Sequence, residues 1–350
     1  MNFLNEMKPK YEHLNSIISD TVSNITFNNE IIVFVDVHQC IKKIFRRNSF
    51  VMPENLPLFI EESVSGILGI ISHYRNYFYK NFGKTSTYYF VYSKSECEYY
   101  KDIFPEYRKT QYDYYYRDHD IFSLKSRILK AAEVVIKATP NAAFIDSSNF
   151  EDFNYVEFII NKLPSNQMAL MLSDNFIWMK NLDKNVFALN GKGIESKLIT
   201  QENVFEEYIS SSTLSNKLIP LILAIAGEKH LSIEGVKSVS LIKAKNIIEK
   251  LIKDGKLLNS KYITFPKEVF IELGNGKLKT EENIRNSIEM IERNFSILEN
   301  PKLHAKDPSE YLARIDLSVP ILPANFFINL ESKLFSNYPI NLEMYLKGEQ

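Results

Sequence analysis

The stretch IIVFVD, residues 31–36, decides the fold of this chain. Its five apolar residues would cover both faces of an extended segment. This pattern is typical of a strand that is buried on both sides in a parallel sheet. The stretch ends in Asp36, and ligands gather at the carboxyl ends of parallel strands. We therefore expect Asp36 to face a functional cleft, although an aspartate at this place could also simply cap the following helix.

Three further segments have the length and composition of strands, namely TSTYYFVY (85–92), AAFI (142–145) and QMALMLSD (167–174). Helical periodicity lies between them, at 60–82, from about Phe122 to Lys137, and at 151–163. Strands that alternate with helices predict an α/β fold with a parallel sheet flanked by helices.

The second part of the chain has a different pattern. From about residue 203 the periodicity is helical, and later helices are expected near 280–298 and 326–336. We expect an α/β domain at 1–200 and a helical domain with a C-terminal tail at 201–350. The tail contains apolar stretches that could dock on a partner or on the chain's own sheet.

Composition limits the classes of function. The 350 residues are 24% charged and 45% hydrophobic with a net charge of -1, which is ordinary for a soluble globular protein. Any nucleic acid must be held by local basic patches, because no overall positive field exists. Cys40 and Cys97 have no metal-type spacing and are interpreted as reduced thiols.

Several features of the sequence bear on localisation. No segment approaches the ~20 apolar residues of a membrane span, and the first residues lack a signal peptide's apolar core. The abundance of Tyr (20), Phe (24), Lys and Asn is expected of an AT-rich genome, such as that of a phage, a virus or a low-GC bacterium. We expect a cytoplasmic protein without a membrane partner, located in the host cytoplasm if the chain is viral.

Two more acids resemble Asp36 in their placement. Asp174 ends the fourth predicted strand, and Glu151 opens the helix that follows the third. The three carboxylates could converge in one cleft at the edge of the sheet. Each also has a structural explanation, because Asp174 could cap a helix and Glu151 could be favoured by a helix dipole.

The segment GEKHLSIEGVKSVSLIKAKNII, residues 227–248, has the outline of a helical hairpin that grips DNA. Two short helical runs flank a turn built on Gly235 and Val236. Lysines that could contact phosphates cluster in the same segment, at Lys229, Lys237, Lys243 and Lys245.

These features, in this order, resemble the 5′-nuclease family, which comprises flap endonucleases, the 5′-nuclease domain of bacterial DNA polymerase I and phage 5′→3′ exonucleases. The resemblance covers roughly residues 30–300. It rests on four short motifs: VFVDVHQ (33–39), PEYRK (105–109), Glu151-Asp152-Phe153-Asn154 for the family's E-A-D-D, and Ser173-Asp174-Asn175-Phe176 for its T-D-x-D. GEKHLSIEGVKSVS matches the spacing of G-D-x-x-D-N-I-x-G-V-x-G-I-G without a gap. The resemblance implies a PIN-like sheet followed by a helix-hairpin-helix region.

The resemblance also implies a metal-dependent phosphodiesterase site, but several ligand positions have changed. Asp36, Glu151 and Asp174 remain, and Glu228 replaces an aspartate. Five carboxylate positions of the family hold other residues here, namely Ser93, Phe153, Asn154, Phe176 and Leu231. The remaining three acids could hold at most one Mg²⁺ or Mn²⁺, because two divalent ions need a denser group of carboxylates.

For nucleic acid, the resemblance assigns Tyr107 and Arg108 to the phosphate and the hairpin around Gly235 to the backbone. Ser238 and Ser240 replace two family glycines, so the turn is expected to differ or to have lost its monovalent ion. A basic patch beside the predicted groove comprises Lys42, Lys43, Arg46 and Arg47. A solvated surface is the alternative for this patch and for Arg108.

Other aromatic and histidine residues have simpler interpretations. The tyrosines Tyr112, Tyr114, Tyr115 and Tyr116 could stack on bases. The compositional bias of the chain favours core or surface packing for them instead. His38 and His119 have no partners at ligand spacing, and we interpret both as structural or surface residues. We expect Trp178 to be in the core.

Three functions are compatible with the sequence. The favoured one is a catalytically degenerate 5′-nuclease-like protein that binds DNA or RNA, or a protein partner, in a phage or viral replication, transcription or packaging assembly. The second is an active metal-dependent 5′→3′ exonuclease or flap endonuclease, or a one-metal PIN-type ribonuclease, with a reduced carboxylate site. The third is a structural subunit that uses the fold as an interaction platform.

Overall fold

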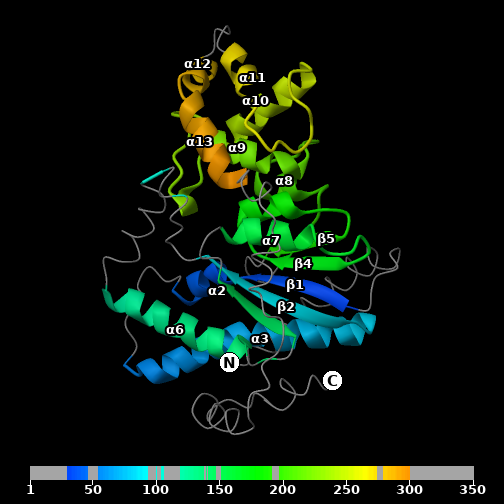
Figure 1. Cartoon of the computed structure of the whole chain (residues 1–350), viewed down its shortest axis with the longest axis vertical. Helices are drawn as coiled ribbons and strands as arrows, with labels where there is room; N and C mark the ends of the chain where they lie inside the picture. The colour runs from blue at the N-terminus through cyan, green and yellow to red at the C-terminus, as the bar shows by residue number, and fades with distance from the viewer. Residues whose placement is uncertain are drawn as a thin grey trace.

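A computed structural model describes residues 30–45, 54–93, 100, 104–105, 119–137, 139, 141–146, 151–190, 197–273 and 279–299. Its centre is a six-stranded sheet with the order β3-β2-β1-β4-β5-β6 (Figure 1). The strands are β1 (Glu30–Asp36), β2 (Thr85–Tyr92), β3 (Ala142–Asp146), β4 (Met168–Leu172), β5 (Val186–Asn190) and β6 (Lys197–Ile199). The parallel α/β fold is therefore confirmed, and β5 and β6 are strands that the sequence pattern did not predict.

The register places the ends of four strands at one edge. Asp36 of β1 is paired with Val91 of β2, and Val35 is paired with Leu172 of β4. β3 continues the parallel pairing on the outer side of β2. β6 alone is antiparallel, where it pairs with β5. The carboxyl ends of β1, β2, β3 and β4 consequently lie at one edge of the sheet.

Three helices cover one face of the sheet: α2 (Val37–Ile44), α3 (Leu56–Phe82) and α6 (His119–Lys137). The alternation of side chains in β1 sends Ile31 and Val33 into this layer and Ile32 and Phe34 into the opposite one. Both sets are buried, which explains why the strand reads as a continuous apolar run.

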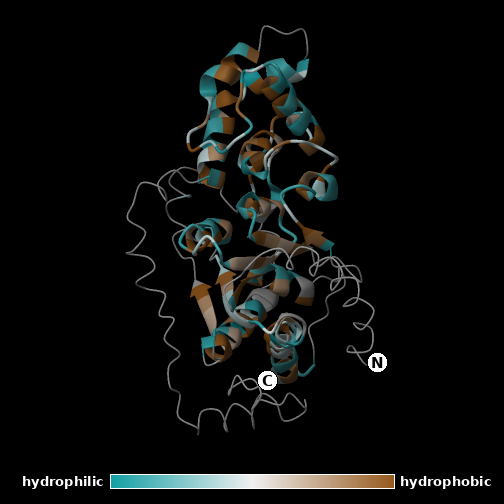
Figure 2. Cartoon of the chain, turned by 90° about the vertical axis from the view of Figure 1, so that its right-hand side faces the viewer, coloured by the Kyte–Doolittle hydropathy of each residue, from teal (hydrophilic) through white to brown (hydrophobic). Residues whose placement is uncertain are grey.

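The opposite face is covered by α7 (Asp152–Ile160), by the 3-10 turn η1 (Phe176–Asn181) and by the second part of the chain. That part contains α8 (Val204–Tyr208), η2 (Asn216–Leu218), α9 (Ile219–Ala226), η3 (Lys229–Leu231), α10 (Leu241–Lys253), α11 (Lys267–Glu272), α12 (Lys279–Arg285) and α13 (Ile288–Glu299). Helices α10, α12 and α13 carry both polar and apolar residues along their lengths (Figure 2).

One apolar core continues from the sheet into these later helices. It includes Phe34 of β1, Phe153 of α7 and Leu298 of α13. Trp178, which we expected in the core, has no exposed surface. The domain boundary at residue 200 stays a prediction, and the described core extends across it.

One predicted helix of the second part is divided in the structure. The expected helix at 280–298 is interrupted between α12 and α13 at Asn286 and Ser287, residue types that extend helices poorly. The predicted helix at 326–336 lies outside the described residues. Among the helices of the described ranges, none combines the length and the hydropathy that crossing a membrane requires.

A buried group of charges joins the two parts of the chain. The ammonium of Lys180 in η1 lies 2.8 Å from the Glu157 carboxylate of α7 and 3.6 Å from that of Glu299 in α13. Lys261, from the loop between α10 and α11, contacts the same two carboxylates. We call these four residues the charge network. Burial alone would raise the pKa of Glu157, but the charges of Lys180 and Lys261 lower it to about 2.

Candidate functional site

Asp36 lies at the end of β1 and caps α2. Its Oδ1 accepts a hydrogen bond from the backbone N–H of Gln39 at 3.0 Å, so the structural interpretation of this aspartate is correct. Its Oδ2 accepts a second bond from the Ser173 hydroxyl at 2.7 Å. Ser173 follows β4 on the neighbouring strand. Asp36 therefore caps a helix and also faces the edge at which β1 and β4 end.

Asp174 lies beside Asp36. Its backbone N–H donates to Oε1 of Gln39 at 3.0 Å. Burial raises the pKa of Asp36 to about 6, and the negative charge of Asp174 adds to this shift. The hydrogen bonds from Ser173 and Gln39 and the charge of Lys42 oppose it. The structure thus brings together two of the three predicted acids.

Glu151 is fully buried at the start of α7. Its carboxylate makes no capping hydrogen bond to α7 and instead accepts one from the Ser93 hydroxyl at 3.1 Å. Ser93 directly follows β2 and also lies against His38, whose Nε2 is 2.8 Å from the Ser93 carbonyl oxygen. A hydroxyl therefore holds Glu151 to the edge of the sheet, at the position where the 5′-nuclease pattern has an acid. His38 has the structural role that we expected.

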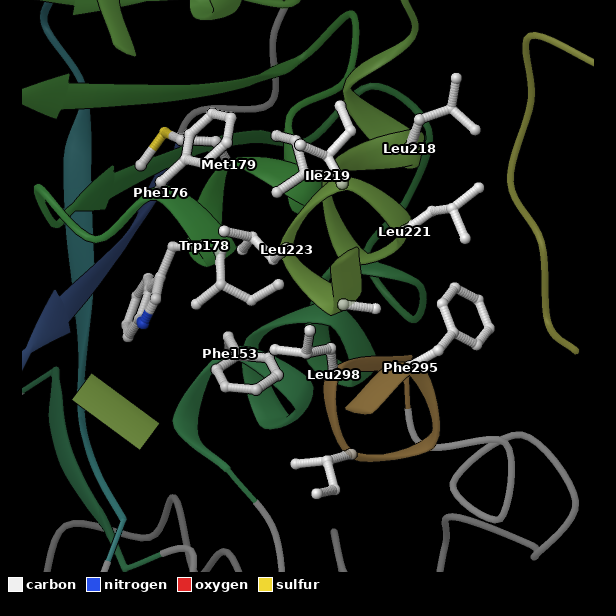
Figure 3. Close-up of a cluster of buried hydrophobic side chains, with 14 of the residues drawn as sticks. Phe153, Phe176, Trp178, Met179, Leu218, Ile219, Leu221, Leu223, Phe295 and Leu298 are labelled. Atoms are coloured by element: carbon white, nitrogen blue, oxygen red, sulfur yellow. The ribbon is translucent and has the colours of Figure 1, made fainter. Parts of the chain in front are cut away.

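Three of the five changed ligand positions lie in the apolar core. Phe153, Phe176 and Leu231 are all buried members of it, and Figure 3 shows the first two among the core side chains. The Phe176 ring stacks on Tyr208 with 4.9 Å between centroids. Burial raises the pKa of Tyr208, and nearby Asp174 raises it further, so this phenol lies in an apolar setting next to the acid.

The Asn154 side chain, at a fourth changed ligand position, is already hydrogen-bonded within the protein. Its Oδ1 accepts a hydrogen bond from the Lys180 ammonium at 3.0 Å, and its Nδ2 donates to the Tyr100 hydroxyl at 3.0 Å. Where the family resemblance places a carboxylate, this chain therefore has an amide bound to the charge network.

The donors at this edge can be compared with the needs of a divalent ion. Asp36 and Asp174 supply adjacent carboxylates, whose oxygens have lone pairs beyond those already engaged. This pair fits one hydrated Mg²⁺ or Mn²⁺, because Mg²⁺ is often bound by one or two carboxylates and several waters. In the described ranges, no set of three acidic, histidine or cysteine side chains is grouped around a common ion position. The phenylalanine positions offer no ligand for a second ion.

The hairpin keeps a close backbone approach at its two glycines. A Cβ on Gly235 would lie 2.0 Å from the carbonyl oxygen of Ala226, and one on Gly227 would lie 2.4 Å from the Gly235 nitrogen. The turn is closed by a bond from the Val236 N–H to the Ile225 carbonyl. Glycine is therefore required at both positions. For Gly235 this agrees with what the resemblance to the 5′-nuclease hairpin implies.

The two serines that replace family glycines behave differently from each other. Ser238 has φ of +66°, so this position keeps the left-handed conformation at the steric cost that glycine avoids. Ser240 has φ of -81° and caps α10 through a bond from the Lys243 N–H. The substitution at Ser240 thus supplies a helix cap.

The predicted phosphate-binding lysines of the hairpin are not equivalent. Lys229, Lys237 and Lys243 are exposed, and the Lys243 ammonium also donates to the Ser238 carbonyl at 2.9 Å. Lys245 is buried, because its ammonium donates to the Ser210 hydroxyl at 2.8 Å and pairs with Glu249 at 3.5 Å. Lys245 therefore connects α10 to a neighbouring loop, a position unsuited to a phosphate contact.

The remaining predicted binding residues are placed only in part. Lys42 is exposed on α2, on the same helix that Asp36 caps. The side chains of Lys43 and His119 are not described, and Arg46, Arg47, Tyr107, Arg108 and the tyrosine run lie outside the described residues.

Sequence reasoning overlooked Gln39 as a site residue. It is the third residue of α2 after the Asp36 cap. A glutamine at this place commonly bonds back to the cap residue's own N–H, so its position marks it as a capping group. Its actual bond to Asp174 could be known only once β1 and β4 were known to be neighbours.

Comparison with solved structures agrees with the fold described above. The 5′-exonuclease of T5 with bound zinc is similar with a TM-score of 0.58 and 17% identity, over 78% of this chain and 90% of that one. A bacteriophage T5 D15 flap endonuclease in a complex with DNA and metal ions is similar with a TM-score of 0.59 and 17% identity, over 87% and 99%. No protein-family model and no curated protein matches the sequence. The chain has the 5′-nuclease fold.

Proposed function

We propose that this chain is a catalytically degenerate 5′-nuclease-like protein that binds the backbone of DNA or RNA. It would act in the cytoplasm, together with a protein partner, in a phage or viral replication, transcription or packaging assembly. The fold shared with the T5 enzymes supports a role on nucleic acid.

One observation supports the loss of two-metal chemistry: apolar core side chains occupy three positions where the 5′-nuclease family has metal ligands. Phe153, Phe176 and Leu231 pack in the apolar core. Two divalent ions bring four positive charges, and placing a divalent charge against apolar side chains without ligands is very costly. The described acids therefore support binding better than two-metal cleavage.

The hairpin supports backbone binding. Its glycine contacts are kept, and Lys229, Lys237 and Lys243 are exposed on one connected segment. Contacts between lysines and phosphates are independent of sequence and weaken as salt displaces them. We expect affinity for nucleic acid to fall steeply with ionic strength.

A one-metal phosphodiesterase is the second candidate, because Asp36 and Asp174 remain adjacent at the strand ends. An ion held there would supply a polarised water and would offset the charge on a phosphate. In this candidate Asp36 and Asp174 bind the ion directly, and Ser173 and Gln39 orient them.

One experiment separates the candidates. The protein is incubated with 5′-flap DNA, single-stranded DNA and RNA, in Mg²⁺ or Mn²⁺, beside an Asp36→Ala/Asp174→Ala double variant. We expect salt-dependent binding and no cleavage. Cleavage that disappears in the double variant would establish the one-metal enzyme instead.

A third outcome of this experiment would support the structural-subunit function. If neither binding nor cleavage is found, and the protein is recovered from its native host in a stable complex, the fold serves as an interaction platform.

Triple substitution of Lys229, Lys237 and Lys243 by Gln is the matched test for binding, because all three side chains are exposed and the folded core should be unaffected.

A further inference from the structure

Helix α12 is fixed to the hairpin that carries the exposed lysines. The Asn283 side chain, in the middle of α12, donates a hydrogen bond to the backbone carbonyl of Lys237 at 3.1 Å. The buried carboxylate of Glu281 also pairs with Lys250 of α10 at 2.9 Å, so α12 lies beside α10 (Figure 1). The hairpin and α12 therefore adjoin each other in space, although they are separated in the sequence.

The helical repeat brings a further lysine to this junction. Lys279 precedes Asn283 by four residues, so the two side chains lie on the same face of α12. They are about 6 Å apart along the helix axis. Lys279 and Lys237 are both exposed to solvent. Two exposed lysines from segments far apart in the sequence consequently lie on one surface.

The neighbouring acids are engaged or lie on other sides. Glu281 is buried in its ion pair with α10. Glu282 is exposed, but it is about 100° from Asn283 around the helix axis. The exposed Glu234 belongs to the part of the hairpin that adjoins α13, where its carbonyl accepts a hydrogen bond from Asn294 at 2.8 Å. Of the described residues, those that join the hairpin to α12 therefore favour an anionic ligand.

We propose that α12 extends the nucleic-acid-binding surface of the hairpin. Lys279 is a binding residue for a phosphate of the strand that Lys237 contacts, and Asn283 is the positioning residue that holds α12 against the hairpin. This inference rests on the proposed nucleic-acid binding and adds a second element to its contact surface. A strand of a duplex offers a phosphate about every 3.4 Å along the duplex axis, so lysines that share a surface can each contact a different phosphate.

Three variants separate the contact from its alternatives. Lys279→Gln removes one positive charge at an exposed position, so the folded core should be unaffected. Lys253→Gln is the matched control, because this exposed lysine ends α10 about 18 Å from the helix end that joins the hairpin. Asn283→Ala removes the hydrogen bond to Lys237 and leaves the net charge unchanged.

The measurement is the affinity for fluorescently labelled 5′-flap DNA by anisotropy, over a series of NaCl concentrations. A chelator is present, so that monovalent salt alone determines the salt dependence. We expect Lys279→Gln to lower the slope of log affinity against log salt by about 0.9, the value for one lost phosphate contact. At the lowest salt, affinity should fall about three- to fivefold. Lys253→Gln should leave the slope unchanged.

The role of Asn283 is tested by combining two of these variants. If Asn283 positions α12, Lys279→Gln should cost less affinity in the Asn283→Ala protein than in the unaltered one, because Lys279 is no longer held beside the strand. An equal cost in both proteins would remove the positioning role.

The remaining results overturn the phosphate contact. An unchanged slope in Lys279→Gln would mean that Lys279 binds no phosphate, and an equal fall in Lys253→Gln would mean that only overall charge acts. The Lys229, Lys237 and Lys243 triple variant separates these failures from that of the proposed function. If the triple variant loses binding while Lys279→Gln behaves like the unaltered protein, hairpin binding stands and only the α12 contact fails. If the unaltered protein binds no nucleic acid, both fail.

Discussion

At the scale of single residues, Asp36 shows how a buried acid can cost stability. Its carboxyl group is buried, and its pKa is raised to about 6, so the ionised form is disfavoured in the folded protein. Such a cost is common at ligand sites, where a group is kept for binding at the expense of folding.

We predict that Asp36→Asn stabilises the metal-free protein at neutral pH by about 1–3 kcal/mol, the free energy of ionising a group with this shift. The Asn oxygen can still accept from the Gln39 N–H, and its NH₂ group can donate to Ser173. The change is measured by urea unfolding in the presence of a chelator. Asn175→Asp, which adds a negative charge where Asp36→Asn removes one, serves as the comparison. A loss of stability would show that the carboxylate is well accommodated.

Phe176 is the residue at which the apolar replacement can be reversed. Phe176→Asp restores an acid at the family position but removes the contacts with Phe205 and Tyr208 and buries a charge near Asp174. We predict a loss of about 3–5 kcal/mol in the free energy of unfolding. Thermal unfolding with and without Mn²⁺ provides the decisive comparison. We expect Mn²⁺ to raise the Tm of the variant no more than that of the unaltered protein, because Phe153 and Leu231 still occupy the other ligand positions. A rise that is much larger in the variant would show that this single acid is enough to restore an ion site.

At the scale of elements, the hairpin requires glycine at Gly227 and Gly235, whereas at Ser238 it accepts a serine at a steric cost. We predict that Gly235→Ala destabilises the protein by more than about 2 kcal/mol, because its Cβ would overlap the Ala226 carbonyl. Ser238→Gly should stabilise it by about 1 kcal/mol, since φ is +66° there. Urea unfolding of both variants checks the opposite signs. Equal effects would mean that the turn relaxes to a different backbone.

The elements also show what a single sequence can and cannot predict. β1, β2, β3 and β4 were predictable because each is a bounded apolar run, and their carboxyl ends placed Asp36 and Asp174 correctly at one edge. β6 escaped because it is only 3 residues long, too short for a reliable period. β5 has the same 5 residues as β3 and β4, so its length does not explain why it was overlooked. The bond between Gln39 and Asp174 and the burial of Lys245 depend on tertiary neighbours, which periodicity does not reveal.

At the scale of the whole molecule, the charge network has the most consequences, because it joins the α/β part to the last described helix. Lys180 and Glu299 are almost completely buried, and Glu157 is 8% exposed. Removing one member of a buried ion pair is costly because its partner keeps an uncompensated charge. The network therefore makes the packing of α7 against α13 depend on charge as well as on apolar contact.

This dependence gives a pH prediction whose sign is determined. The pKa of Glu157 falls from its ordinary 4.5 to about 2 on folding, so its contribution is fully present above pH 4.5 and is lost as the pH falls toward 2. We predict that Glu157→Gln costs about 2–3 kcal/mol at neutral pH, and that the difference from the unaltered protein shrinks over this window. Urea unfolding at a series of pH values measures it. The control is Glu133→Gln in the exposed pair with Lys137, which should change stability by less than about 0.5 kcal/mol at any pH. A Glu157→Gln effect that stays constant as the pH falls would show that its cause is packing, and that charge does not connect the two parts of the molecule.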